Sequence, residues 1–154
     1  MILSKNRNAF TLIEILLVVA ILSILLVVVF AALNPAQRLM DTRNARRWND
    51  VNQILTAVHT CIVDNDLATC GLTENGNAYQ LGTCTGTGAT LCTVAEADCL
   101  DLSQELVDYL QSIPLDPSDG LAATTAYSIT VGTNGIITVS ACRAEDNETI
   151  SVSR

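Results

Sequence analysis

The sequence predicts an α+β fold in which a long N-terminal helix, first membrane-spanning and then amphipathic, packs on a small antiparallel β-sheet head with disulfides. Three observations support this prediction. Residues 10–33 form an apolar run in which Thr11, Glu14 and Ser23 are the exceptions. Residues 34–63 carry apolar side chains at helical spacing, and residues 127–153 contain short alternating stretches typical of strands. All six cysteines follow the apolar run.

The apolar run is long enough to cross a membrane. A helix rises about 1.5 Å per residue, so residues 10–33 span about 36 Å, compared with about 30 Å for a hydrocarbon core. Glu14 lies inside this run, and no basic residue of the run accompanies it. Two simpler interpretations remain open. One is a secretory signal cut near Ala31, whose apolar core is usually only about 7–15 residues long. The other is a permanent signal anchor, which explains the length but not the carboxylate.

The helical continuation begins at Asn34-Pro35. Proline lacks an amide hydrogen and disfavours helical backbone at the preceding residue, so a break or kink is expected here. The same pair equally suits the start of a new helix, with Asn34 as N-cap and Pro35 as first helical residue. Asp50 and Ala57 lie outside the predicted apolar stripe. The stripe, which we expect to pack on the head, consists of Trp48, Val51, Ile54, Leu55, Val58 and Ile62.

The remaining sequence predicts a head of turns and short strands. Residues 64–101 are rich in Gly, Thr and Asn and predict loops, in which short strands are possible. Residues 102–113 have apolar side chains at helical spacing and precede Pro114, which predicts a short helix. Residues 127–131 and 136–141 flank a Gly-Thr-Asn-Gly turn and predict a hairpin, and residues 148–153 predict a third strand.

Charge is distributed unequally along the chain. Residues 1–47 hold six basic and two acidic side chains, a net charge of +4, and residues 48–154 hold two basic and fourteen acidic ones, a net charge of −12. A head this acidic repels phosphates, so no nucleic acid partner is expected. The arginines at 38, 43, 46 and 47 are expected to line the helix below the head and meet acidic neighbours, with lipid headgroups or nucleic acid as alternatives.

The cysteine spacing predicts disulfides. No two cysteines form a CxxC pair, which argues against zinc. Disulfides imply an oxidising compartment outside the cytoplasmic membrane, although the Lys and Arg bias alone would leave the head inside. Neighbour pairing is our expected connectivity, namely Cys61–Cys70, Cys84–Cys92 and Cys99–Cys142.

Catalytic residues are not evident. His59 is the single histidine, so one chain holds neither a histidine-based triad nor a multi-histidine metal site. No acidic pair has a spacing that suggests acid–base catalysis. Asn147-Glu148-Thr149 fits the N-glycosylation triplet, which is common by chance. We therefore expect no enzyme.

The N-terminal residues resemble those of type IV pilins and type II secretion pseudopilins. A short basic leader precedes AFTLIE, an unbroken apolar helix, an amphipathic continuation and a head that ends in strands. The family's cleavage motif is a small residue, usually glycine, before Phe-Thr-Leu-Ile-Glu, and Ala9 takes the place of glycine here. The resemblance implies that prepilin peptidase cuts between Ala9 and Phe10 and methylates the amine of Phe10. It divides the chain into a leader (1–9), a transmembrane and filament-core helix (10–33), an amphipathic helix (34–63) and an extracytoplasmic head (64–154).

The resemblance also implies a structural subunit. Such a protein is a single-pass protein of the cytoplasmic membrane with its head outside, until assembly machinery builds identical copies into a helical filament on the surface or in the periplasm. Glu14 would pair with the amine of Phe10 of an adjacent copy and set the register between helices. No cofactor is expected, except that residues 106–117 resemble a pseudopilin segment followed by a calcium loop. Asp116 and Asp119 are thus calcium candidates or part of an ordinary turn.

The rival interpretation is a membrane-anchored, disulfide-rich binding module that does not polymerise. It accounts for the apolar run and for the cysteines as well as the filament subunit does. It gives Glu14 no role.

Overall fold

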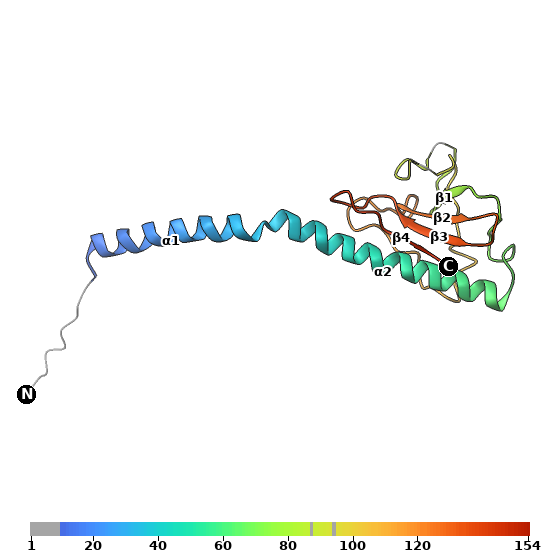
Figure 1. Ribbon diagram of the computed structural model, residues 1–154, viewed down its shortest axis with the longest axis horizontal. Helices are drawn as coiled ribbons and strands as arrows, with labels where there is room; N and C mark the ends of the chain where they lie inside the picture. The colour runs from blue at the N-terminus through green and yellow to red at the C-terminus, as the bar shows by residue number, and fades with distance from the viewer. Residues whose placement is uncertain (1–9, 87, 94) are drawn as a thin grey trace, which may run out of the picture. The chain divides into compact units, whose positions relative to one another are not determined.

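The computed structural model describes residues 10–86, 88–93 and 95–154, so the predicted leader, including Ala9, lies outside the described residues. The chain divides into two compact units, Met1–Leu39 and Met40–Arg154. The helices come first in the chain and are followed by one small antiparallel sheet (Figure 1), which confirms the α+β class. The elements in chain order are α1 (Leu12–Leu33), α2 (Pro35–Asp64), β1 (Ala78–Gln80), β2 (Tyr127–Val131), β3 (Ile137–Ala141) and β4 (Ser151–Ser153).

The first unit is dominated by α1, which has no buried residue. Its 22 residues extend about 33 Å, and by length and composition it can cross a membrane. The helix ends where Asn34 adopts left-handed backbone, with φ 39°, a conformation that asparagine tolerates better than most residues. α2 starts directly afterwards at Pro35, and the amide of Arg38 donates to the carbonyl of Asn34 at 3.3 Å. The predicted interruption at Asn34-Pro35 is therefore confirmed.

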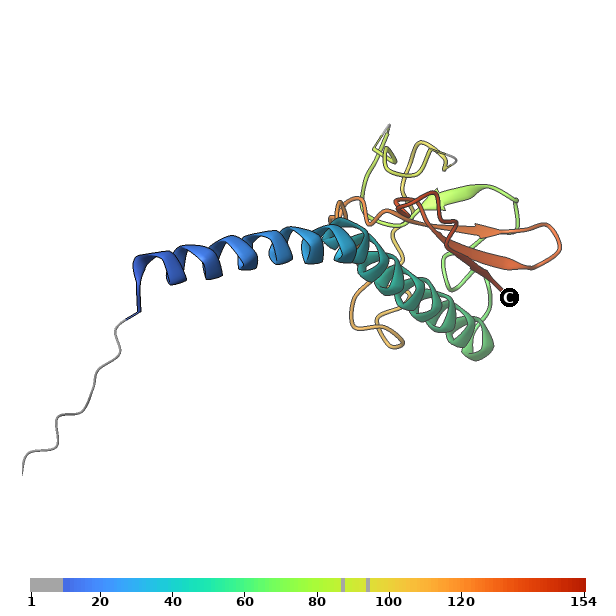
Figure 2. The same ribbon diagram turned by 60° about the vertical axis from the view of Figure 1, so that its left-hand side comes forward.

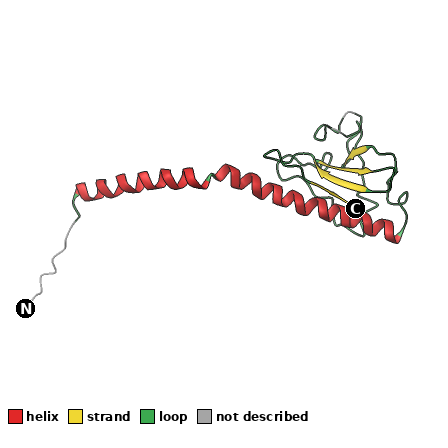
Figure 3. Cartoon of the chain, in the orientation of Figure 1, coloured by secondary structure: helices red, strands yellow, loops and turns green. Residues whose placement is uncertain are grey.

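The second unit is built by packing α2, from Met40 onward, on one face of a four-stranded antiparallel sheet with strand order β1-β2-β3-β4 (Figures 2 and 3). Alternate residues of β2 and β3 enter the core, as the two-residue period of a strand requires. Tyr127, Ile129 and Val131 of β2 are buried, and so are Ile137, Val139 and Ala141 of β3. The predicted hairpin is confirmed, with Ile129 opposite Val139.

The buried face of α2 differs from the predicted stripe at its margins. Val51, Ile54, Leu55 and Val58 are buried as predicted, but Trp48 remains 37% exposed. Asp50 and Ala57, expected outside the stripe, are buried. Asp50 is tolerated there because its Oδ2 accepts a hydrogen bond of 2.6 Å from the hydroxyl of Tyr127.

The predicted helix at 102–113 was wrong. Leu102, Leu106 and Leu110 are buried at the expected spacing, but the segment forms successive turns. The amides of Leu106 and Leu110 donate to carbonyls four residues back, whereas that of Tyr109 donates to the carbonyl of Leu106. A helix this short has little stability of its own, so its contacts with the core decide the backbone.

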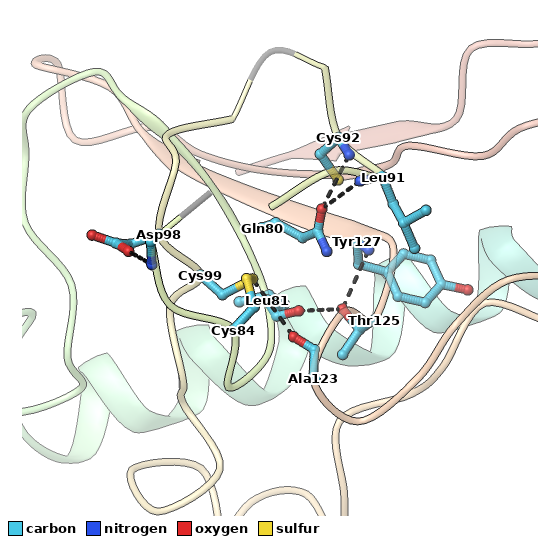
Figure 4. Close-up of a disulfide and its surroundings, with 11 residues drawn as sticks. Gln80, Leu81, Cys84, Leu91, Cys92, Asp98, Cys99, Ala123, Thr125 and Tyr127 are labelled. Carbon is cyan, nitrogen blue, oxygen red and sulfur yellow. Dashed lines mark hydrogen bonds between the residues drawn. A yellow bond between two sulfur atoms is a disulfide. The ribbon is translucent and has the colours of Figure 1, made fainter. Parts of the chain in front are cut away.

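The disulfides correct the expected connectivity in two of three pairs. Cys61–Cys70 is confirmed, but the other bonds join Cys84 to Cys99 and Cys92 to Cys142. The amide of Cys99 donates to the carbonyl of Cys84 at 3.1 Å, which brings these two residues side by side. Buried Gln80 accepts hydrogen bonds of 3.2 and 3.0 Å from the amides of Leu91 and Cys92, and so holds Cys92 over the sheet (Figure 4). Cys142, which directly follows β3, is then its partner.

The two edges of the sheet differ. Beside β1, the amide of Glu96 donates to the carbonyl of Ala78 at 2.7 Å, and the amide of Leu100 donates to the carbonyl of Gln80 at 2.8 Å. The chain thus covers the β1 edge with its own backbone. The opposite edge consists of β4, which is three residues long and carries two exposed serines.

Candidate functional site

The N-terminal site is a reciprocal cap at the start of α1. The amide and the hydroxyl of Thr11 each donate to Oε2 of Glu14 at 2.8 Å. In return, the amide of Glu14 donates to Oγ1 of Thr11 at 3.3 Å. This is a capping box, in which each side chain satisfies a backbone amide that the helix leaves free. The sequence pattern Thr-x-x-Glu at 11–14 is its signature, although our sequence-based prediction did not include it.

The box leaves Glu14 able to accept a further donor. Both hydrogen bonds to its carboxylate use Oε2, and no basic side chain within the described ranges forms a salt bridge with it. The adjacent Phe10 is 81% exposed. The start of a helix also carries partial positive charge, which favours a carboxylate there. Glu14 is thus stabilised within its own chain, yet one of its oxygens remains available.

The head carries a second polar site, which we call the arginine clamp: Arg43, Asn44 and Arg47 of α2 with Asp116 and Glu145. Arg47 is fully buried, and its Nε lies 2.6 Å from Oδ2 of Asp116. Its Nη1 lies 2.8 Å from Oε2 of Glu145. Arg43 also binds Glu145 with two nitrogens, at 2.7 and 2.5 Å. Arg43 and Arg47 lie four residues apart, so both reach the same carboxylate from one helix face.

The clamp also fixes the loop between β3 and β4. Asn44 donates to the carbonyl of Glu145 at 2.9 Å and accepts from its amide at 3.1 Å. Asn44 and the indole of Trp48 each donate to the carboxylate of Glu148, at 2.7 and 2.9 Å. These contacts join residues about one hundred positions apart. The sequence predicted acidic neighbours for the arginines, and for Arg43 and Arg47 these belong to their own head.

The ion pairs of the clamp stabilise the charged forms of its side chains. Burial alone would lower the pKa of Arg47, but its hydrogen bonds to Asp116 and Glu145 raise the pKa overall. Hydrogen bonds from Arg43 and Arg47 lower the pKa of Glu145 to about 2. Burial alone would raise the pKa of Asp116, yet the bonds from Arg47 and Ser118 bring it below its ordinary value. All three groups are therefore charged at neutral pH.

We expect the head to lose stability in acid through Glu145. Its ordinary pKa is 4.5 and its folded pKa about 2, so protons bind more readily to the unfolded chain. The stabilisation is complete above pH 4.5 and is lost as the pH falls towards 2. Fluorescence of Trp48, the single tryptophan, can follow unfolding in denaturant at each pH. The Glu145→Gln variant should show a weaker pH dependence in this window, and identical profiles would contradict the assignment.

The calcium candidates take different partners. Asp116 binds Arg47, and its Oδ1 also accepts from the amide of Ser118 at 2.9 Å. Asp119 binds Arg143, with Nε and Oδ2 at 2.8 Å. In the part of the chain that the structure describes, no group of three or more His, Cys, Asp or Glu side chains could hold a metal ion. The contacts of the two aspartates are thus those of an arginine-bound turn.

A family model, the prokaryotic N-terminal methylation motif, matches residues 4–30. The match contains Ala9, Phe10 and the whole capping box, and it extends over most of α1. The chain carries the prepilin leader and N-terminal motif of pilin-like proteins. The motif indicates a pilin-like substrate of prepilin peptidase, and proteins of the pilin type are structural. No curated protein and no solved structure matches the chain.

Proposed function

We propose that this pilin-like protein is a filament subunit, which prepilin peptidase cuts between Ala9 and Phe10 and which then polymerises through α1. The observation that carries the proposal is that α1 is apolar on all sides and has no buried residue. Burying one large aliphatic side chain is worth about 1.5–3 kcal/mol, so this surface requires an apolar environment. The membrane supplies it before assembly, and the helices of neighbouring copies supply it afterwards.

Glu14 favours a filament over a permanent membrane anchor. A carboxylate in the apolar core of a filament needs a partner. The capping box occupies Oε2, and the amine of Phe10 from an adjacent copy would provide a cation for Oε1. Such a buried polar contact would fix the axial register, as it does in coiled coils. The cut is required first, because Phe10 otherwise has no free amine and the basic leader would have to enter the core.

The disulfides favour a head outside the cytoplasmic membrane. Three bonds join all six cysteines, and such bonds persist in oxidising compartments. The head would therefore form the surface of a filament outside the cell or in the periplasm. The assembly machinery that extracts the subunit from the membrane would be its transient partner.

The mass of the mature protein, purified from the cells that make it, tests the proposal. We expect the chain to lack residues 1–9 and to carry one added methyl group on the amine of Phe10. An intact N-terminus would contradict processing. A cut near Ala31 would also contradict it, and either result would favour the anchored or secreted binding module. An Ala9→Gly variant, which restores the usual small residue before the cut, should be processed at least as completely.

A further inference from the structure

The turn at residues 145–148 presents Asn147 at the surface of the head. Asp146 and Asn147 have positive φ angles of 58° and 56°, and the amide of Glu148 donates to the carbonyl of Glu145 at 3.2 Å. This is the pattern of a tight type I′ turn, in which Asp and Asn adopt left-handed backbone more readily than most residues. Asn147 is exposed, and within the described residues its side-chain amide has no partner.

Asn147 is followed by the residues that an N-glycosylation acceptor needs. Asn147-Glu148-Thr149 is the one Asn-x-Ser/Thr triplet in the sequence, and its middle residue is not proline. Thr149 is exposed too, and none of the described residues hydrogen-bonds to its hydroxyl. The sequence alone gave a triplet that is common by chance. The structure adds that both reacting positions lie on an open turn.

Residues of α2 hold this turn through Glu145 and Glu148, and no described residue of α2 hydrogen-bonds to Asn147. On one side of Asn147, Glu145 binds Arg43, Arg47 and Asn44. On the other side, the carboxylate of Glu148 binds Asn44 and Trp48. The flanking side chains are thus directed to α2, and Asn147 is the residue of the turn that faces solvent unpaired.

We propose that Asn147 is an N-glycosylation site of this protein. The co-substrate would be an oligosaccharide linked through pyrophosphate to a membrane lipid. A bond forms between Nδ2 of Asn147 and the anomeric carbon of the sugar. The bond from that carbon to the pyrophosphate oxygen breaks, its electron pair stays on that oxygen, and the proton lost from Nδ2 passes to solvent. The products are the glycosylated chain and the lipid pyrophosphate. This proposal rests on one part of the proposed function, namely that the head faces outward, where such a donor can reach it.

Mass spectrometry of the protein from its native cells tests the proposal. Trypsin cuts after Arg143, and the next basic residue is Arg154, so residues 144–154 form one peptide that contains the triplet and no cysteine. We expect this peptide to exceed its sequence mass by a whole number of sugar residues. Thr149→Ser keeps the triplet and should keep the added mass, whereas Thr149→Ala should return the peptide to its sequence mass.

Two results would overturn the proposal: a wild-type peptide at its sequence mass, or an added mass that persists in Thr149→Ala. The N-terminal peptide of the same sample reports cleavage and methylation at Phe10. The glycosylation site and the filament-subunit function can therefore fail independently of each other.

Discussion

We expect a Glu14→Val variant to insert into the membrane and to form no filaments. A carboxylate in a membrane helix disfavours insertion by up to about 2.5–3.5 kcal/mol, so valine makes the inserted monomer more stable. Valine cannot bind the amine of Phe10 from an adjacent copy, which leaves a buried amine without a partner and the helices without a register. The amounts of membrane-bound and sheared filament protein, compared with wild type, measure the two effects separately.

Glu14 both caps α1 and carries a negative charge, so a second variant is needed to separate these two effects. Glu14→Gln keeps an oxygen that can accept from the amide of Thr11, so the start of α1 stays capped while the charge is lost. If the charge sets the register, this variant should also fail to assemble. Normal filament yield from Glu14→Gln would show that Glu14 acts as a helix cap alone.

Ser23→Val is the matched control on the same helix. The hydroxyl of Ser23 donates to the carbonyl of Val19 at 2.7 Å, so this polar group is already satisfied within its own helix. Replacing it also makes α1 more apolar but removes no charge that could bind the amine of another copy. We expect filament yield near that of wild type.

The second large effect is expected at Arg47. An Arg47→Met variant keeps the length of the side chain but leaves Asp116 buried without its cation. Removing one partner of a buried ion pair typically destabilises a protein by about 3–5 kcal/mol. We therefore expect a large loss in the free energy of unfolding of the head. Denaturant unfolding of the full-length protein in detergent, followed by the fluorescence of Trp48, measures it.

Arg46→Met provides the comparison for Arg47. Arg46 is 63% exposed, and its ion pair with Asp50 is long, at 3.9 Å. Because the guanidinium of Arg46 is largely solvated and the contact is long, we expect this pair to contribute roughly 0–1 kcal/mol. Equal destabilisation of the two variants would show that the buried position of Arg47 is not what stabilises the head.

Local chemistry was enough to predict part of the fold. Strict alternation over 127–131 and 137–141 defined the hairpin, and the missing amide hydrogen of Pro35 defined where one helix ends and the next begins. The turns at 102–113 were mistaken for a helix because Leu102, Leu106 and Leu110 have helical spacing. Spacing shows which side chains face the core, but not whether every intervening amide finds a helical partner.

The contacts within the sites were predictable only where the two residues are close in sequence. Thr11 and Glu14 lie three residues apart, and a search for capping boxes would have found them. Asp116 lies 69 positions from Arg47, and several other acids could have taken its place. Two of the three disulfides were predicted wrongly for the same reason, because the pairing of Cys92 with Cys142 depends on the buried amide of Gln80 holding a distant loop.

The covered edge of the sheet lowers the tendency of neighbouring heads to aggregate. Exposed strand edges of two molecules can pair through backbone hydrogen bonds, and such aggregation increases with local concentration. Here residues 96–100 occupy the β1 edge, and the β4 edge is too short to offer a long template. Heads crowded on a filament or in a membrane pool would therefore resist merging their sheets into amyloid-like stacks. Subunit association would then be left to the apolar helix α1.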